Sequence, residues 1–233
     1  MAFTNSSLAN VKILSPNHSG QRNHAIDTIT IHCVVGQCTV ESLGKLFASP
    51  ERKASSNYGI GYDGRIGLYV EEKNRSWCSS SASNDHRAIT IEVASDTKEP
   101  YAVTDKAYAS LIELVADICK RNNIKQLLWK ADKSLIGQVD KQNMTVHRWF
   151  AATACPGTYL YNKYPQIAKD VNAKLGKSSL ETGAEIVKEL MGSKHKIQIN
   201  EVDRAIKAVD RAKHDANYSS LYWILYKLVN GNG

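Results

Sequence analysis

The sequence predicts an α/β fold for residues 1–176, followed by a small all-helical domain. Short segments rich in β-branched residues alternate with helix-like segments from residue 28 to about residue 175, which is the order of elements typical of an α/β protein. A polar stretch then precedes three further helical patterns. We therefore predict a domain over residues 1–176, a linker over 177–179 and a second domain over 180–233.

Four short segments are predicted as strands because they are rich in β-branched residues: Thr28–Cys33, Tyr58–Ile60, Arg65–Val70 and Ala88–Val93. Between the second and the third lies Asp63-Gly64, and Asp-Gly is a strong signal for a tight hairpin turn. We expect these two strands to form a β-hairpin.

Three helices are predicted within the first domain: Thr39–Phe47, Thr104–Asn122 and Pro165–Leu175. The second places its apolar residues at the spacing of one buried stripe, and Thr104 is suited to cap its N-terminus. Gly176 is a natural stop for the third.

Three helical patterns follow the linker, Glu181–Met191, Glu201–His214 and Tyr218–Val229. A domain of this size buries little surface. The third pattern is apolar around much of its girth, so we expect that helix to pack against the other two or against a partner. A structural bundle and a dimerising bundle both fit this pattern.

The composition limits the function classes. The net charge is +7, and a basic chain suggests nucleic acid. However, Lys and Arg form no run and no known nucleic-acid motif occurs, so we expect no nucleic-acid partner. No segment approaches the roughly 18–20 apolar residues of a membrane span, and the first ten residues lack the features of a secretory signal. We expect synthesis in the cytoplasm and no membrane insertion.

The chain has five cysteines, an odd number, at irregular spacings and without a Cys-x-x-Cys pair. A disulfide framework is therefore not expected. We expect most of these thiols to be buried as small hydrophobic groups.

Two of the predicted strands share one pattern. Residues 29–32 read Ile-Thr-Ile-His and residues 89–92 read Ile-Thr-Ile-Glu. Successive strand residues point to opposite faces, so His32 and Glu92 emerge on the same face if the strands lie close in one sheet. Taken alone, the pattern also fits a histidine that only forms hydrogen bonds.

A later segment reads His-Arg-Trp-Phe-Ala-Ala-Thr-Ala-Cys-Pro-Gly, from His147 to Gly157. Histidine and cysteine are both good zinc ligands. They are too far apart here to share one helical turn, so a loop would have to return Cys155 towards His147. A surface histidine and an unrelated buried cysteine would fit the same segment.

Together these segments resemble the zinc-dependent N-acetylmuramoyl-L-alanine amidases of the phage-lysozyme and peptidoglycan-recognition superfamily. The resemblance covers about residues 10–175 and looks closest to phage endolysins of Gram-positive, clostridial-type hosts. It implies a central mixed β-sheet flanked by helices. It also includes, in the family's order, Ser55–Ile60, Asp63-Gly64, Ser76-Trp77 and Asn84-Asp85.

The resemblance implies Zn²⁺ as the cofactor, bound by His32, His147 and Cys155, with a fourth position left for water. Glu92 matches the family's general base, which takes a proton from the zinc-activated water and passes it to the leaving amine. The bond cut would be the amide between N-acetylmuramic acid and L-alanine of peptidoglycan. Thr153 would donate a hydrogen bond to the developing oxyanion.

Four residues are expected to contact the substrate: Trp77, Asn57, Asn84 and His86. For Trp77 the reason is that aromatic faces pack against sugar rings, although plain core packing fits this residue equally. His86 lies in a segment predicted as a loop before the Glu92 strand.

The chain departs from the family's pattern at three positions. Thr153 stands where many relatives have a lysine, so a neutral donor replaces a cation. Ser56 stands where some phage enzymes have a tyrosine near the metal. Cys78 stands where relatives often have a histidine. A role in the chemistry is therefore not transferred to Ser56 or Cys78.

The resemblance also implies a place of action and partners. An endolysin is released by a holin-type protein and lyses the cell wall, and its C-terminal domain binds wall polymers. Formation of a homodimer through the C-terminal helices is the other interpretation of that domain. Two further function classes are a non-catalytic peptidoglycan receptor of the same fold and a nucleic-acid-binding protein. The intact set of ligands and base argues against the first, and the diffuse charge argues against the second.

Overall fold

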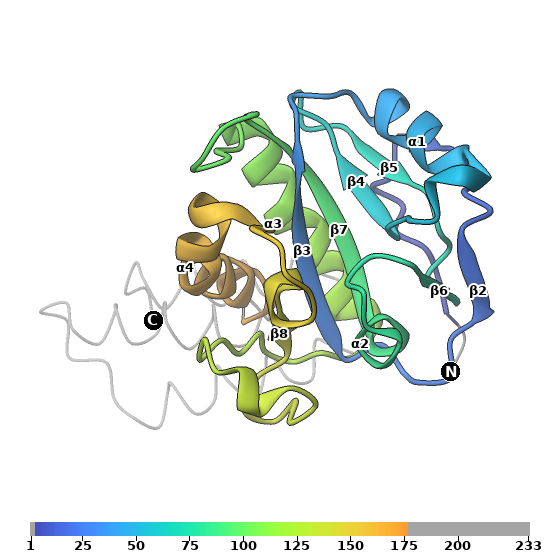
Figure 1. Ribbon diagram of the computed structural model, residues 1–233. Coiled ribbons are helices and arrows are strands. Elements are labelled where there is room, and N and C mark those ends of the chain that lie inside the picture. The colour runs from blue at the N-terminus through green and yellow to red at the C-terminus, as the bar shows by residue number, and fades with distance from the viewer. Residues whose placement is uncertain (1–2, 177–233) are drawn as a thin grey trace, which may run out of the picture. The chain divides into compact units, whose positions relative to one another are not determined.

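The computed structural model describes residues 3–176 of the chain (Figure 1). The predicted linker over residues 177–179 and the predicted C-terminal domain over residues 180–233 lie outside the described residues, so both stay predictions. Among residues 3–176, no helix has the length and apolar character needed to cross a membrane.

The central feature is a six-stranded mixed sheet, which confirms the predicted fold class. Only the hairpin of β4 with β5 is antiparallel, and all other neighbouring strands run parallel. A separate antiparallel pair lies at one side of the domain, formed by β2 (His18–Gln21) and β6 (Asn74–Ser76). In spatial order the sheet strands are β1 (Val11–Lys12), β5 (Ile66–Leu68), β4 (Tyr58–Ile60), β7 (Ala88–Ser95), β3 (Thr28–Val35) and β8 (Met144–Thr145).

Helices cover both faces of the sheet. Figure 1 shows α3 and α4 side by side against its middle, and α1 over β4 and β5. Within residues 3–176 the α-helices are α1 (Val40–Ala48), α2 (Ala82–Arg87), α3 (Asp105–Arg121) and α4 (Gly157–Leu175), and the 3₁₀ segments are η1 (Pro50–Arg52), η2 (Lys133–Leu135) and η3 (His147–Trp149).

The main hydrophobic core lies between the sheet and α3 and α4. The isoleucines of the two central strands all face it because they alternate with polar residues along each strand. Burying such side chains is the dominant favourable term in folding. The fully buried residues here include Ile29, Ile31, Ile89, Ile91, Leu111, Leu114 and Ile118.

On the face of the sheet opposite the main core, the side chain of Tyr69 packs over two glycines. Gly59 of β4 pairs with Gly67 of β5, and a Cβ at either position would come within 2.5 Å of a Tyr69 side-chain atom. The Tyr69 hydroxyl donates to the carbonyl oxygen of Val40, at 2.7 Å. This contact attaches the start of α1 to the face that carries His32 and Glu92.

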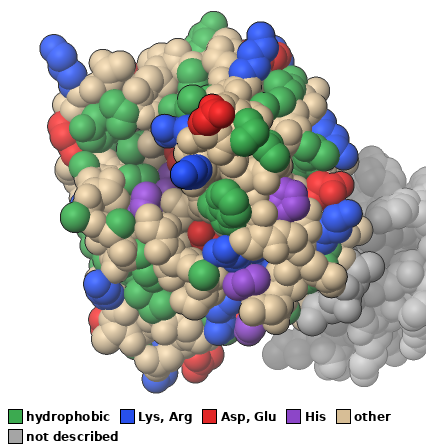
Figure 2. Space-filling view, turned by 45° about the vertical axis from the view of Figure 1, so that its right-hand side comes forward, with side chains coloured by type: hydrophobic (Ala, Val, Ile, Leu, Met, Phe, Trp, Pro, Cys, Tyr) green, Lys and Arg blue, Asp and Glu red, His purple; other side chains and the backbone are tan. Residues whose placement is uncertain are grey.

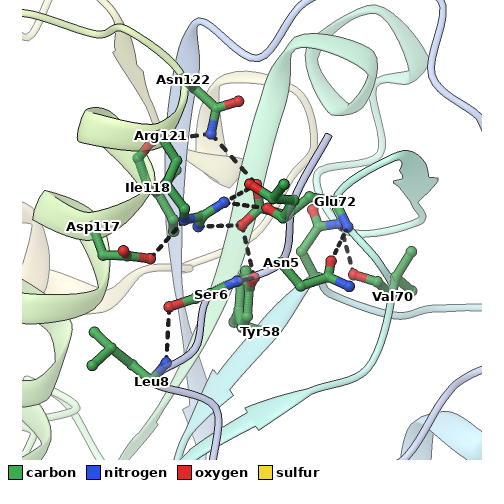
Figure 3. A network of polar contacts seen from close by, with 12 residues as sticks. Asn5, Ser6, Leu8, Tyr58, Val70, Glu72, Asp117, Ile118, Arg121 and Asn122 are labelled. Carbon is green, nitrogen blue, oxygen red and sulfur yellow. Dashed lines mark hydrogen bonds and ion pairs between the residues drawn. The ribbon is translucent and has the colours of Figure 1, made fainter. Parts of the chain in front are cut away.

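A buried carboxylate attaches the N-terminal segment to the domain (Figure 3). Glu72 is fully buried and accepts hydrogen bonds from Arg121 of α3, at 2.6 Å, and from the Tyr58 hydroxyl, at 2.7 Å. Its main-chain N–H donates to the Asn5 side chain at 2.9 Å, and the Ser6 N–H donates to the Tyr58 hydroxyl at 2.8 Å. Removing one partner of such a cluster would leave a buried charge uncompensated.

The short strands β1, β2, β6 and β8 were not predicted, and two helices differ from the prediction. Helix α4 begins at Gly157, well before the predicted start, and Pro165 lies inside it. Leu160 and Tyr164, on its first half, are fully buried and offset the hydrogen bond that the proline cannot make. Residues 83–87, predicted as a loop, belong to the short helix α2 (Ala82–Arg87), and the Ser81 side chain caps this helix by accepting from the N–H of Asn84.

Candidate metal centre and catalytic site

The two strands with the repeated pattern lie side by side. β3 and β7 pair in parallel over their whole length, and His32 is directly opposite Glu92. Thr30 is likewise opposite Thr90. Because residues opposite each other in register share a face, all four side chains lie on the face that α1 covers.

The segment from His147 to Gly157 approaches His32 through a compact loop. The main-chain N–H of Arg148, in η3, donates to the carbonyl oxygen of Cys155 at 3.2 Å, and its side-chain Nε donates to the same oxygen at 3.3 Å. The N–H of Cys155 donates to Oγ1 of Thr153 at 3.2 Å. These bonds return Cys155 towards His147, as the spacing of the two residues requires.

His32, His147 and Cys155 come together at the edge of β3. One ligand atom from each lies within 4.8 Å of the other two. Cys155 Sγ is 3.4 Å from His32 Nδ1, and the two imidazole rings meet edge to face with centroids 5.1 Å apart.

The chemistry of this set fits zinc. His32 is fully buried, and its Nε2 has no hydrogen-bond partner. Burial, with a smaller contribution from His147, lowers the pKa of His32 to about 3, so the ring is neutral. Burial also lowers the pKa of His147. Two neutral imidazoles and a cysteine sulfur are ligands that zinc prefers.

Glu92 lies beside this group. Its carboxylate, Cys78 Sγ and a ring nitrogen of His32 are within 4.8 Å of one another. Burial raises the pKa of Glu92 to about 7, while the nearby charge of Arg52 acts in the opposite direction. Its Oε2 is buried and has no hydrogen-bond partner. A carboxyl group whose pKa lies near neutrality can both accept and return a proton.

The two asparagines predicted to contact substrate are buried beneath the site. Asn57 donates to the carbonyl oxygen of Val70 at 3.1 Å and accepts from the N–H of Thr90 at 3.2 Å. Asn84 donates to Thr30 Oγ1 at 3.1 Å and accepts from Thr145 Oγ1 at 2.9 Å. These bonds hold the strands that carry His32 and Glu92, and the burial speaks against direct contact with substrate.

Three other predicted site residues reach the surface. Trp77 is half-buried, and its Nε1 donates to Ser19 Oγ at 2.7 Å. His86, also half-buried, lies on α2, and its Nδ1 accepts from the N–H of Asn23 at 3.1 Å. Thr153 is exposed in the loop before Cys155. Ser56, by contrast, is fully buried and donates to the carbonyl oxygen of Tyr58.

Two residues near the site were not predicted. Ser80 Oγ is 3.1 Å from Nε2 of His147, and nothing in the run of serines over residues 79–81 distinguishes it. Arg52 lies in η1, and its charge acts to lower the pKa of Glu92. No pattern in the sequence of η1 indicates that this segment lies near the strand of Glu92. On the face shown in Figure 2, basic side chains are interspersed with acidic, histidine and hydrophobic ones.

In comparisons with known proteins, the chain matches one family model and is similar in fold to several solved structures. The family model described as N-acetylmuramoyl-L-alanine amidase matches residues 22–158, more than half of the chain. No curated protein matches the chain. A structure of an AmpD derivative is 19% identical, with a TM-score of 0.52, over 72% of this chain and 99% of that one. A mutant endolysin from Bacillus subtilis is 16% identical, with a TM-score of 0.52, over 70% and 99%.

A third structure is the endolysin amidase LysCS from Clostridium intestinale URNW. It is 19% identical over 72% of this chain and 95% of that one, with a TM-score of 0.49. At these identities, the likeness to AmpD and to the Bacillus endolysin shows a common fold.

Proposed function

Because the chain belongs to the N-acetylmuramoyl-L-alanine amidase family, we propose that it hydrolyses the amide bond between N-acetylmuramic acid and L-alanine of peptidoglycan with the help of zinc. The observation that carries this proposal is the convergence of His32, His147 and Cys155 within 4.8 Å, beside Glu92. Three protein ligands with one position left open are typical of catalytic zinc sites.

His32, His147 and Cys155 would hold the metal. When bound, zinc supplies Lewis-acid chemistry, because it polarises a carbonyl group and lowers the pKa of a coordinated water molecule towards ~7. The neutral state of the two imidazoles favours this binding, since neither ring must lose a proton first. Ser80 orients the His147 ring through a hydrogen bond to Nε2. Metal-bound histidines commonly form such a bond with the ring nitrogen that does not bind the metal.

Glu92 moves the proton. Its Oε2, which has no partner inside the protein, accepts a proton from the attacking water. It then gives this proton to the nitrogen of L-alanine as the amide bond breaks. A pKa near 7 makes both transfers accessible at neutral pH.

Thr153 assists at the substrate oxygen. Its Oγ1 already accepts a hydrogen bond from the N–H of Cys155, so its hydroxyl hydrogen is free to point away from the loop. We assign to this hydroxyl the donation of one hydrogen bond to the oxygen on which negative charge develops.

Substrate binding and wall lysis complete the proposal. Trp77 and His86 contact the glycan or the stem peptide from the surface, and Asn57 and Asn84 support the strands below. The predicted domain over residues 180–233 binds wall polymers, and the enzyme lyses the wall after holin-type release from the cytoplasm. A homodimer formed through that domain is the alternative.

Digestion of purified peptidoglycan tests the activity. We expect new amino groups on L-alanine and no new reducing sugar ends, and removal of the metal by a chelator should stop the reaction. The matched control is Glu92→Gln, which keeps the ligands but lacks the base. New reducing ends would contradict the amidase, and tight binding without any product would favour the receptor.

A further inference from the structure

One buried carboxylate holds the segment that precedes α2. Asp85, on α2, is 2% exposed and accepts hydrogen bonds from the main-chain N–H groups of Cys78 and Ser79, each at 3.1 Å. It also accepts from the Ser79 hydroxyl at 2.6 Å. Hydrogen bonds to a carboxylate are stronger than those between neutral groups. Asp85 therefore fixes both the backbone and the side chain of this segment.

The next residue, Ser80, adopts an uncommon backbone conformation. Its φ is 61°, in the left-handed region that residues with a Cβ rarely adopt. A residue remains there only when its surroundings hold it, and such residues cluster at functional sites. Ser80 is held from both sides. Asp85 binds the two residues before it, and Ser81, the residue after it, caps α2 by accepting from the N–H of Asn84.

Both ends of the segment from Cys78 to Ser80 contact residues of the candidate site. At one end, Ser80 Oγ is 3.1 Å from Nε2 of His147. At the other end, the Cys78 thiol donates to Oε1 of Glu92, at 3.9 Å. The second oxygen of Glu92, Oε2, is buried without a partner among residues 3–176. The thiol therefore binds one carboxylate oxygen and leaves the other available for the proton of the attacking water.

We propose that Asp85 is a positioning residue, which sets the general base and one metal ligand through the segment that it binds. Cys78 places Glu92, and Ser80 places His147. The inference rests on the proposed function, because it takes Glu92 as the base and His147 as a zinc ligand. A hydrogen bond to a metal-binding histidine fixes the orientation of its ring, and a base must lie within hydrogen-bond reach of the proton that it accepts.

Ser80→Gly separates the effect of the hydroxyl from the stability of the fold. Glycine adopts the left-handed conformation without strain, so we expect the metal-free variant to melt at or above the temperature of the unmodified protein. Its zinc affinity should nevertheless fall by roughly 10-fold or more, as is usual when a partner of a metal-binding histidine is lost. Ser80→Ala keeps the strain and should lose the same affinity. Competition with a chelator measures the affinity, and circular dichroism measures the melting temperature.

Cys78→Ala tests the contact with Glu92. The variant lacks the thiol but keeps the main-chain N–H that binds Asp85, so its zinc affinity should stay unchanged. We expect kcat on soluble muropeptides to fall by roughly 10-fold with little change in KM, because the base is no longer held in line with the attacking water. Cys78→Ser offers a shorter donor at the same position and should retain more activity than Cys78→Ala.

Asp85→Ala removes the support of both contacts at once. We expect it to lower zinc affinity and kcat together, whereas the Ser80 and Cys78 variants separate the two effects. Asp85→Asn keeps an acceptor oxygen and should lie between Asp85→Ala and the unmodified protein. The matched control is Glu72→Ala, because Glu72 is another fully buried carboxylate and its partners are Arg121 and Tyr58. This control should melt earlier and still bind zinc with normal affinity.

Two results would overturn the role of Asp85. One is normal zinc affinity and normal kcat in every Asp85 variant that folds. The other is a loss in Glu72→Ala as large as that in Asp85→Ala, because general instability would then explain both. Failure of the proposed function would look different, since the unmodified protein itself would bind no zinc or release no stem peptides.

Discussion

Glu92 combines two properties that a proton carrier needs. One carboxylate oxygen is buried without a partner, and burial raises the pKa of the group to about 7. We expect Glu92→Gln to retain zinc and fold, and to lose activity by about 10²–10⁴-fold, which is typical of a lost general base. Release of stem peptides from peptidoglycan measures the loss, and metal analysis of the same sample shows whether zinc is retained.

Thr153→Ala should be the milder change. It removes one neutral donor from an exposed loop position, whereas the metal would still polarise the same oxygen. Assayed beside Glu92→Gln under the same conditions, it should retain more activity. The reverse order would mean that the two residues do not divide the work as proposed.

Cys155→Ser should weaken zinc binding strongly, because a neutral hydroxyl replaces a soft thiolate. The matched control is Cys38→Ser, since Cys38 is half-buried and, within the described residues, in no group of candidate ligands. Metal content after dialysis measures both variants. Full zinc occupancy in Cys155→Ser would exclude this residue as a ligand.

At the level of single elements, α3 depends on its cap. Thr104 Oγ1 accepts from the N–H of Ala107 at 3.1 Å and donates to the carbonyl oxygen of Tyr62 at 2.6 Å. We expect Thr104→Ala to lower the free energy of unfolding by ~1–2 kcal/mol, with Thr104→Ser close to the unmodified protein. Urea denaturation measures both. Equal losses in the two variants would mean that the methyl group, not the hydroxyl, matters.

The elements with a strong local pattern were predictable from the sequence. The boundaries of β4 are as predicted, and α3 (Asp105–Arg121) follows the predicted N-cap Thr104 and ends one residue before the predicted end at Asn122. The short helix α2 was missed because its six residues carry no apolar stripe. The start of α4 was missed because a proline usually marks the first turn of a helix, whereas Pro165 is held inside this one by the burial around it.

The candidate site was predictable in its residue types and not in its contacts. Strand alternation places His32 and Glu92 on one face, but the pairing of β3 with β7 joins segments far apart in the sequence. Periodicity carries no information about such pairing. For the same reason, the burial of Asn57 and Asn84 could not be predicted, since their partners lie on other strands.

For the whole molecule, zinc would join distant parts of the chain. His32 and Cys155 are 123 positions apart, and a ligand that binds only the folded state stabilises it. We expect a chelator to lower the melting temperature, by roughly 2–4 °C for each kcal/mol of stabilisation lost. Cys155→Ser should respond less to the chelator. An identical shift in both proteins would mean that the metal acts elsewhere.

The predicted division of the chain leads to a separate test. Every residue assigned to catalysis lies before residue 156, so deletion of residues 178–233 should leave cleavage of soluble muropeptides nearly unchanged. The same truncation should act more slowly on intact cells, because a second wall contact raises the effective concentration of the enzyme at its substrate. Equal rates on both substrates would remove the wall-binding role from residues 180–233.

The order of the site residues along the chain also bears on synthesis at the ribosome. The strand with His32 is made early, but Cys155 follows 123 positions later. At roughly 5–20 residues per second, this interval lasts on the order of ten seconds. Throughout this interval a nascent chain holds His32 but lacks Cys155. Products of premature termination before residue 147 would carry Glu92 without an assembled metal centre, so they would be inert towards the wall of the cell that makes them.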